Sequence, residues 1–384
     1  MFRRIFLLTW VSYIGYYLCR KNFSVLMPYF KEDLGWTSGG LANALFLYSL
    51  AYCVGQFTIG WLADRFGSRI LVTLGMIATA GCSALMAVSP NLALLQGVNG
   101  AAQSTGWPGL LKLTRDWFPS TNRGVIMGWW GTSLVVGGFA GTWLATRAAE
   151  THWTRGAWVP SMVLLAIMIA FVTLARDGRS PHADHRPGPL VVNAPLAAIA
   201  AMYFCVKLAR YAFLFWLPLF MTEQLRYSKS DAGYASTAFE AIGFFGVLGA
   251  GYASERFAGG GRFGVAALMM LALALLCVAY PMLSASGPLV NLAAIAAIGV
   301  FTFGPDTLMA GAAVHDVAPP GATASAGGFV NGVGSLGQIL SPYVVSTLST
   351  QFGWDTLFPV LGGFAVLGAL ALATQLRPAW RTTS

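Results

Sequence analysis

Charged residues are scarce in this chain. Only 10% of its 384 residues are Asp, Glu, Lys or Arg, whereas soluble domains carry about 25%. Hydrophobic residues make up 56%, and the mean hydropathy is +0.64. Because a soluble fold of this size has too little interior to bury so much apolar surface, a soluble globular protein is excluded.

Cysteine is also rare, and its placement indicates neither a disulfide framework nor a metal site. The five cysteines all lie inside hydrophobic runs, without CxxC spacing. They are Cys19, Cys53, Cys82, Cys205 and Cys277. No catalytic nucleophile, metal-ligand cluster or phosphate-binding glycine loop lies in a loop long enough to hold an active site. We therefore expect neither an enzyme nor a bound cofactor or metal.

The chain instead contains long apolar runs. A bilayer core about 30 Å thick requires about 20 apolar residues per helix. Twelve runs of this kind cover residues 5–30, 40–62, 69–89, 92–115, 124–147, 156–175, 192–221, 232–253, 263–284, 288–313, 322–349 and 355–376. They predict an all-α membrane protein with twelve transmembrane helices in two pseudo-symmetric six-helix bundles.

One polar linker, at 177–191, lies almost at the midpoint of the chain. It predicts an N-terminal six-helix bundle over 1–176, a cytoplasmic linker, and a C-terminal six-helix bundle over 192–384. The first apolar run contains Arg20 and Lys21 and continues past any small-residue cleavage site. That continuity favours a retained helix over a signal peptide.

Basic residues gather in alternate loops, and the net charge is +9. With the N-terminus inside, the inner loops and ends hold Arg3, Arg4, Arg65, Arg69, Lys112, Arg115, Arg123, Arg176, Arg179, Arg186, Arg256, Arg262, Arg377 and Arg381. The outer loops hold Lys31, Arg147, Arg155, Arg226 and Lys229. Because cytoplasmic loops accumulate Lys and Arg, this asymmetry predicts a multi-pass protein of a bacterial-type inner membrane with both termini cytoplasmic. The same asymmetry explains the net positive charge, so nucleic-acid binding is not needed to account for it.

Two patterns recur in the same order in each half. Leu18, Arg20, Phe23, Pro28 and Phe30 recur at a constant offset of 190 as Leu208, Arg210, Phe213, Pro218 and Phe220. Gly60, Trp61, Ala63, Asp64, Arg65 and Phe66 recur at an offset of 191 as Gly251, Tyr252, Ser254, Glu255, Arg256 and Phe257. The alternative is a chance similarity of apolar segments. We predict a duplicated six-helix unit, with the substrate site near the membrane midplane between the halves.

An arginine lies deep within the first and the seventh runs. Arg20 is about 22 Å into its helix at 1.5 Å per residue, and Arg210 holds the equivalent position. An arginine at the bilayer centre costs at least about 2.5–3.5 kcal/mol. One interpretation is that each arginine pairs with a carboxylate such as Glu240 or Asp306 and locks helices together. The other is that both guanidinium groups face a central cavity and bind a phosphate or carboxylate through paired hydrogen bonds.

A lysine accompanies each arginine, and both lysines are candidate substrate ligands. Lys207 lies three residues before Arg210 and therefore on nearly the same helical face. Lys21 follows Arg20 and lies about 100° round the helix from it. Whether Lys21 faces the same space is left open.

The face of the first helix that carries Arg20 also carries Tyr17 and Tyr13. Their hydroxyl groups are candidate ligands for the same anion, although tyrosines at helical spacing also serve packing. Weaker candidates, each also explained as a helix-packing group, are Gln56, Trp107, Asn331 and Gln338.

Two acidic residues, Glu240 and Asp306, lie inside the apolar runs. Intramembrane carboxylates are expensive and are usually functional. Either residue is suited to bind a proton during transport, to pair with an arginine in the empty state, or to recognise an amine on the substrate. The sequence does not choose among these roles.

The loop between the second and third runs carries the pattern GxxxDRxGxR, formed by Gly60, Asp64, Arg65, Gly67 and Arg69. In this position among twelve helices the pattern resembles the signature loop of the major facilitator superfamily. A carboxylate beside a helix start and arginines in a tight glycine turn can form a breakable contact between halves. Asp64, Arg65 and Arg69 are therefore candidates for gating or coupling, together with Asp306.

The segment from Tyr16 to Pro28, YYLCRKNFSVLMP, resembles the organophosphate:phosphate antiporters of that superfamily, which take up glycerol phosphate and hexose phosphates. Further matches are Gly106, Trp107, Pro108, Leu208, Arg210, Tyr211, Trp216, Pro218, Glu240, Gly304, Pro305, Ala318 and Pro319. The resemblance covers nearly the whole chain.

The resemblance implies that Arg20 and Arg210 bind the phosphate group. It also assigns tyrosines of the site to Tyr17, Tyr13 and Tyr52.

Three positions depart from the family pattern. A lysine of the second helix falls on Gln56, a histidine of the fifth on Leu134, and an aromatic residue three positions before the seventh-helix arginine on Lys207. These departures leave the organic part of the substrate open.

The leading hypothesis is alternating-access transport of a small organic phosphate or phosphonate in exchange for inorganic phosphate. The alternatives are a proton-coupled symporter of organic carboxylates and a transporter-like sensor of hexose phosphate. Position 19 is Cys where the related carboxylate symporters often have Asp, which disfavours the first alternative. We expect small anions and membrane lipid as partners, no nucleic acid, and a monomer.

Overall fold

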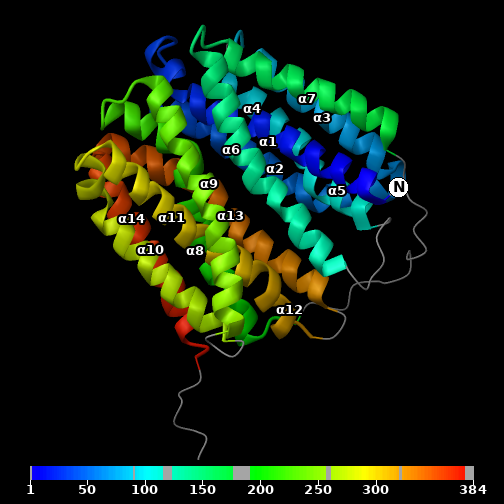
Figure 1. Cartoon of the computed structure of the whole chain (residues 1–384), viewed down its shortest axis with the longest axis vertical. Helices are drawn as coiled ribbons and strands as arrows, with labels where there is room; N and C mark the ends of the chain where they lie inside the picture. The colour runs from blue at the N-terminus through cyan, green and yellow to red at the C-terminus, as the bar shows by residue number, and fades with distance from the viewer. Residues whose placement is uncertain are drawn as a thin grey trace, which may run out of the picture. The chain divides into compact units, whose positions relative to one another are not determined.

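The computed structural model describes residues 2–89, 91–115, 123–175, 191–256, 261–319 and 322–376, apart from the side chains of 2, 60, 61, 64, 114, 115, 123–128 and 324. The described chain is helical with short connections (Figure 1). The helices are α1 (Phe2–Glu32), α2 (Ser38–Phe66), α3 (Ser68–Leu85), α4 (Leu92–Gln103), α5 (Gly106–Arg115), α6 (Arg123–Ala149), α7 (Arg155–Leu174), α8 (Ala194–Glu223), α9 (Lys229–Arg256), α10 (Arg262–Ala285), α11 (Pro288–Leu308), the π-helix η2 (Met309–Ala313), α12 (Val314–Val317), α13 (Thr323–Gln351) and α14 (Trp354–Ala373).

Each of the twelve predicted runs coincides with a helical stretch, which confirms the predicted fold class. Two of the runs are interrupted. The run at 92–115 divides into α4 and α5, and the run at 288–313 continues from α11 through η2 into α12. Neither interruption was predicted from the sequence.

Ser104 and Thr105 separate α4 from α5. The Thr105 hydroxyl donates to the Ala102 carbonyl oxygen at 2.7 Å and shares a 2.7 Å hydrogen bond with the Tyr16 hydroxyl. Pro108 lies in the first turn of α5, where its missing N–H group leaves no helical hydrogen bond unmade. The interruption is therefore stabilised by the hydrogen bond to Tyr16 of α1 as well as by the local sequence.

The second interruption follows Pro305 near the end of α11. Proline removes a backbone hydrogen bond within a helix, and the π-helical turn Met309–Ala313 begins four residues later. Single π-turns inside helices are frequent at functional sites. Asp306 thus lies between a proline and a π-turn, where the helix backbone is least regular.

Seven helical stretches of the described chain are long and apolar enough to cross a membrane. They are Ser38–Ile59, Ser68–Leu85, Arg155–Leu174, Ala194–Glu223, Arg262–Ala285, Pro288–Val317 and Trp354–Ala373. The helix α1 is long enough but carries Arg20 and Lys21 within its apolar stretch. The protein is therefore a multi-pass membrane protein.

The helices form two compact units. Unit 1 contains Met1–Ala183 together with Phe213–Ala241 and Pro342–Thr347, and unit 2 contains Asp184–Ala212, Ile242–Ser341 and Leu348–Ser384. The C-terminal part of α8 and the N-terminal part of α9 thus belong to unit 1. The predicted bundle boundaries at 176 and 192 stay a prediction.

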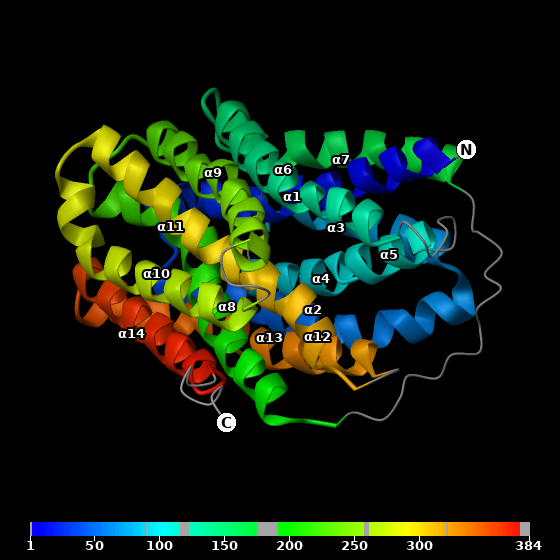
Figure 2. The ribbon, with the colours of Figure 1, turned by 60° about the horizontal axis from the view of Figure 1, so that its bottom comes forward.

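In unit 1, α1 packs against α3, α5, α6 and α7, as the dark blue helix of Figure 2 shows. Glycines of α6 permit the closest approach. A Cβ atom at Gly137 would lie 2.7 Å from the Tyr17 Cβ, and one at Gly141 would lie 2.7 Å from the Tyr17 carbonyl oxygen. Because these distances are shorter than van der Waals contact, only glycine fits there, and α6 fixes the position of the segment that carries Arg20.

A second close approach joins α2 to α4. A Cβ atom at Gly100 would lie 2.1 Å from the Tyr48 carbonyl oxygen. The missing side chain lets the two backbones touch one turn before Gln103. This contact brings the side chains of Tyr48 and Gln103 together.

In unit 2, α10 packs against α14 and α11 (Figure 1). A Cβ atom at Gly246 of α9 would lie 2.1 Å from the Val300 carbonyl oxygen of α11. One at Gly337 of α13 would lie 2.2 Å from the Phe204 carbonyl oxygen of α8. Helices α8 and α11, which carry Arg210 and Asp306, are therefore each held by a glycine contact.

Candidate functional site

Arg20 lies on α1 in the interior of unit 1, with 3% of its surface exposed. Its Nε donates a 2.7 Å hydrogen bond to Oε1 of Gln103 on α4. The Tyr48 hydroxyl donates to the same oxygen at 2.9 Å. The Gln103 amide nitrogen donates to the Cys19 carbonyl oxygen at 3.3 Å and to Asn99 at 3.2 Å, so the Gln103 side chain is fixed on every side.

Tyrosine rings surround the Arg20 guanidinium group. Its central carbon lies 4.5 Å from the ring centroid of Tyr17, 4.9 Å from that of Tyr52 and 6.0 Å from that of Tyr48. Cations are attracted to aromatic faces at these separations. We call Arg20, Gln103, Tyr17, Tyr48 and Tyr52 the Arg20 cluster.

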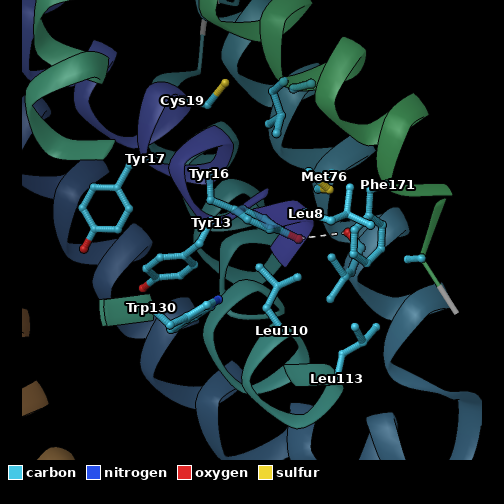
Figure 3. Packing of buried hydrophobic residues seen from close by; sticks show 14 of the residues in the cluster. Leu8, Tyr13, Tyr16, Tyr17, Cys19, Met76, Leu110, Leu113, Trp130 and Phe171 are labelled. Carbon is cyan, nitrogen blue, oxygen red and sulfur yellow. Dashed lines mark hydrogen bonds between the residues drawn. The ribbon is translucent and has the colours of Figure 1, made fainter. Parts of the chain in front are cut away.

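Figure 3 shows how α1 directs its tyrosines. Tyr17 and Tyr13 point to one side, and Tyr16 points to the other, toward α3. The Tyr16 hydroxyl donates to the Val72 carbonyl oxygen at 2.9 Å. The ring centroid of Tyr13 lies 5.2 Å from that of Trp130 and 5.4 Å from that of Tyr17. Tyr13 therefore supports Tyr17 from below, whereas Tyr16 is structural.

The Arg20 charge meets only neutral groups among the described residues. Gln103 and the tyrosines supply no negative charge, and Nη2 of Arg20 is buried without a hydrogen-bond partner in the described chain. A buried cation without an anion is unfavourable. The arrangement thus leaves a positive charge and a hydrogen-bond donor available for an anionic ligand.

Lys21 points away from the Arg20 cluster. Its Nζ forms a 2.7 Å ion pair with Oε1 of Glu240 on α9 and donates to the Leu214 carbonyl oxygen at 2.7 Å. The Lys21 side chain is 3% exposed and that of Glu240 is 2% exposed. Gly138 of α6 borders the pair, since a Cβ atom there would lie 2.9 Å from the Glu240 Cγ. Glu240 therefore pairs with Lys21 and not with an arginine, a partner that the sequence did not predict.

Arg210, in unit 2, pairs with Asp306 as the locking interpretation predicted. Its Nη1 lies 2.7 Å from Oδ2 of Asp306, and the two side chains are 7% and 9% exposed. The guanidinium carbon also lies 4.6 Å from the Phe303 ring centroid. The two arginines thus differ, because Arg210 has a carboxylate partner.

Lys207 lies on the same face of α8 as Arg210, as predicted. Its Nζ donates to Oδ1 of Asn331 on α13 at 2.7 Å and lies 4.9 Å from the Tyr203 ring centroid. Tyr203 interacts electrostatically with Asp306 as well as with Arg210. We call Arg210, Asp306, Lys207, Asn331 and Tyr203 the Arg210 cluster.

Four further predicted residues, Gln56, Asp64, Arg65 and Arg69, lie on α2 and at the start of α3. The Gln56 amide donates to the Ser104 carbonyl oxygen at 3.3 Å, which places it against the α4–α5 interruption. Arg69 donates to the Val172 carbonyl oxygen, and Arg65 is exposed beside the Phe66 ring. The side chain of Asp64 lies outside the described residues. Gln56, Arg65 and Arg69 therefore lie in neither arginine cluster.

Sequence reasoning missed Gln103 and Tyr48. A signal for Gln103 was present, because Gln96, Asn99 and Gln103 recur on one face of an otherwise apolar run and all three are buried. Tyr48 lies one turn before Tyr52 on α2. A polar stripe within a membrane helix marks a face turned away from lipid.

The sequence profile of the Major Facilitator Superfamily matches residues 5–304 and 199–383. The chain therefore belongs to this superfamily of membrane transporters and is not an enzyme. A bacterial homolog of the human lysosomal transporter Spinster, solved in an inward-facing and occupied conformation, has the same fold, with a TM-score of 0.83 over 96% of both chains at 13% identity.

Curated relatives narrow the branch of the superfamily. The chain is 26% identical to the glycerol-3-phosphate transporter of Bacillus subtilis, over 96% of this chain and 91% of that protein. It is 25% identical to a glucose-6-phosphate exchanger of Mus musculus, over 98% of this chain and 93% of that protein. These matches confirm the predicted resemblance to the organophosphate:phosphate antiporters.

Proposed function

We propose that the protein transports a small organic phosphate or phosphonate across a cytoplasmic membrane by alternating access, in exchange for inorganic phosphate. Relatives named for glycerol 3-phosphate and glucose 6-phosphate transport support the substrate class. The predicted six-helix bundles over 1–176 and 192–384, with both termini cytoplasmic, are part of this proposal.

The proposal rests mainly on Arg20, whose guanidinium group has a donor available for an anion. A phosphate group presents several negatively charged oxygens to a planar fork of N–H donors, and arginine binds such groups through two parallel hydrogen bonds. Arg20 is buried, fixed by Gln103 and without a described acidic partner. A group held in this way is prepared to bind an anion rather than to lock helices.

We place the second phosphate contact at Arg210, the repeat-related arginine. Lys207, one turn before Arg210 on α8, would add a further positive charge. Tyr17 and Tyr52 would line the ligand beside Arg20, since their rings already flank its guanidinium group.

Phosphate-driven counterflow in proteoliposomes tests this function. Vesicles loaded with inorganic phosphate are expected to take up labelled glycerol 3-phosphate or phosphate. Arg20→Lys and Arg210→Lys are each expected to abolish most exchange, because an ammonium cannot reproduce the two-donor fork. The control Arg155→Lys changes an exposed arginine whose side chain donates to the Thr151 hydroxyl, and it is expected to exchange normally.

Undiminished exchange in both Lys variants would remove the mechanism. Uptake of an organic carboxylate without uptake of any phosphate would favour the symporter alternative. Tight phosphate binding without flux would favour the sensor.

A further inference from the structure

Three buried amide side chains lead away from Arg20 along one face of α4. They belong to Gln103, Asn99 and Gln96, and each is 2% exposed or less. The Gln103 amide donates to Oδ1 of Asn99 at 3.2 Å, and the Asn99 amide donates to Oε1 of Gln96 at 3.1 Å. The Gln96 amide donates to the sulfur of Met86, which follows α3, at 3.1 Å. We call Gln96, Asn99 and Gln103 the amide row.

Each end of the amide row meets a group that forms only one kind of hydrogen bond. A guanidinium group donates and has no acceptor, so the atom of Gln103 that faces Nε of Arg20 at 2.7 Å must be its oxygen. A thioether sulfur accepts and has no hydrogen to donate, so Gln96 must turn its nitrogen toward Met86. Because the row runs from a donor to an acceptor, every amide in it points its oxygen toward Arg20.

The orientation of each amide depends on its neighbours. If Asn99 alone turned over, its nitrogen would face the nitrogen of Gln103 and its oxygen would face the oxygen of Gln96, and two buried hydrogen bonds would be lost. Leaving buried polar groups unpaired costs more than the net value of the bonds themselves. The three amides are therefore coupled, and aligned hydrogen bonds of this kind polarise one another.

The alignment favours a positive charge at its end. Each amide dipole has its negative oxygen on the side of Arg20. The helix α4 itself ends at Gln103, so the negative end of the helix dipole lies there as well. The row thus stabilises the Arg20 guanidinium group with neutral side chains. A carboxylate at the same place would compete with a bound anion, whereas an amide does not.

From these contacts we infer that Asn99 and Gln96 are positioning residues for Arg20. They act through Gln103, whose oxygen holds Nε of the guanidinium group, while Nη2 is buried without a hydrogen-bond partner in the described chain. The inference rests on the proposed function, in which Nη2 binds a phosphate. The amide row orients Arg20 before that phosphate arrives.

Gln103 has further contacts outside the amide row. The Tyr48 hydroxyl of α2 donates to its oxygen at 2.9 Å, and its amide nitrogen also donates to the Cys19 carbonyl oxygen of α1 at 3.3 Å. These contacts remain when Asn99 is changed. Loss of Asn99 therefore weakens the orientation of the Gln103 amide without releasing α4 from α1 and α2.

The phosphate affinity of detergent-purified variants tests the inference. Asn99→Leu removes an acceptor for the Gln103 amide, and it is expected to weaken the affinity for inorganic phosphate about three- to tenfold, the equivalent of one hydrogen bond. Gln96→Leu, one link further from Arg20, is expected to weaken it about two- to threefold. Gln96→Glu keeps an acceptor oxygen for Asn99 in either protonation state, and it is expected to bind phosphate as the wild type does.

Asn291→Leu is the matched control. Asn291 lies on α11 in unit 2, is similarly buried, and accepts a 2.9 Å hydrogen bond from the Tyr280 hydroxyl. Its replacement is expected to lower the melting temperature about as much as Asn99→Leu and to leave the phosphate affinity unchanged. A loss of affinity that follows from general destabilisation would appear in both variants.

A spectroscopic measurement separates positioning from stability. The ¹⁵Nε–¹H resonance of Arg20, assigned by its absence in Arg20→Lys, reports the hydrogen bond to Gln103 in the ligand-free protein. It is expected to shift in Asn99→Leu and to stay in place in Asn291→Leu. Should Asn99→Leu fail to fold, Gln96→Leu and Gln96→Glu provide the same comparison.

An unchanged Arg20 resonance in Asn99→Leu, or wild-type phosphate affinity in that variant, would overturn the inference and leave the proposed function standing. Equal phosphate affinities of Gln96→Leu and Gln96→Glu would also overturn it. A wild-type protein that binds no phosphate would overturn the proposed function, and the Arg20 resonance of the ligand-free protein would still test the amide row.

Discussion

The contact between α2 and α4 leads to a prediction with opposite signs at two neighbouring glycines. Gly100 faces the Tyr48 carbonyl oxygen, and an added Cβ would lie 2.1 Å from it. Gly97, three residues earlier on α4, offers more room, since an added Cβ would lie 3.6 Å from the Leu47 Cβ. Alanine at Gly97 therefore fits in ordinary contact, whereas alanine at Gly100 forces the helices apart.

The magnitudes follow from these distances. Overpacking of a tight interface costs about 1–3 kcal/mol, while alanine in place of a helical glycine without strain stabilises by about 0.4–1 kcal/mol. Gly100→Ala also pulls Tyr48 from Gln103, whose 2.9 Å hydrogen bond fixes the partner of Arg20. We expect phosphate affinity to fall in this variant and to be unchanged in Gly97→Ala.

Thermal unfolding of the detergent-purified protein, with and without inorganic phosphate, measures both effects. The expected order of melting temperature is Gly97→Ala above wild type and wild type above Gly100→Ala. The shift produced by phosphate is expected to be smaller only in Gly100→Ala. Equal melting temperatures for the two variants, or an undiminished phosphate shift in Gly100→Ala, would refute the reasoning.

Three further predictions concern charged side chains and their partners. Lys21→Met is expected to destabilise by about 3–5 kcal/mol because it leaves Glu240 buried without its cation, and the added change Glu240→Gln is expected to recover most of that loss in a thermal unfolding series. Gln103→Glu places a carboxylate against Arg20, and titration with phosphate is expected to show at least about a tenfold weaker affinity, equal to about 1.4 kcal/mol. Lys229→Ala is expected to change the melting temperature little, because it removes partly exposed ion pairs that contribute about 0–1 kcal/mol.

The sequence predicted the helices well because apolar length is a local property. Each of the twelve runs became helix, and the departures within the described helices are the two interruptions. The break at Ser104 and Thr105 depends on the hydrogen bond between Thr105 and Tyr16, which lie 89 residues apart. A contact of that kind leaves no local pattern in the sequence. Pro305 is a local signal for the second interruption, but it was not used to predict one.

The partners of the charged residues were predicted only in part. Helical spacing placed Lys207 on nearly the same face as Arg210 but left the direction of Lys21 open, and Lys21 pairs with Glu240 in the structure. Which acid faces which base depends on helix packing, and the two arginines proved different although the repeat made them equivalent. Asp306 pairs with Arg210, while the amide of Gln103 occupies the corresponding role at Arg20.

The most direct test of the account is whether the guanidinium groups of Arg20 and Arg210 bind phosphate. Solid-state NMR can measure dipolar coupling between ³¹P of the ligand and ¹⁵N in labelled arginine side chains of the protein in lipid. The account predicts coupling to two arginines at hydrogen-bonding separation, with one lost in Arg20→Lys and the other in Arg210→Lys. Phosphate bound with coupling to neither arginine would contradict it.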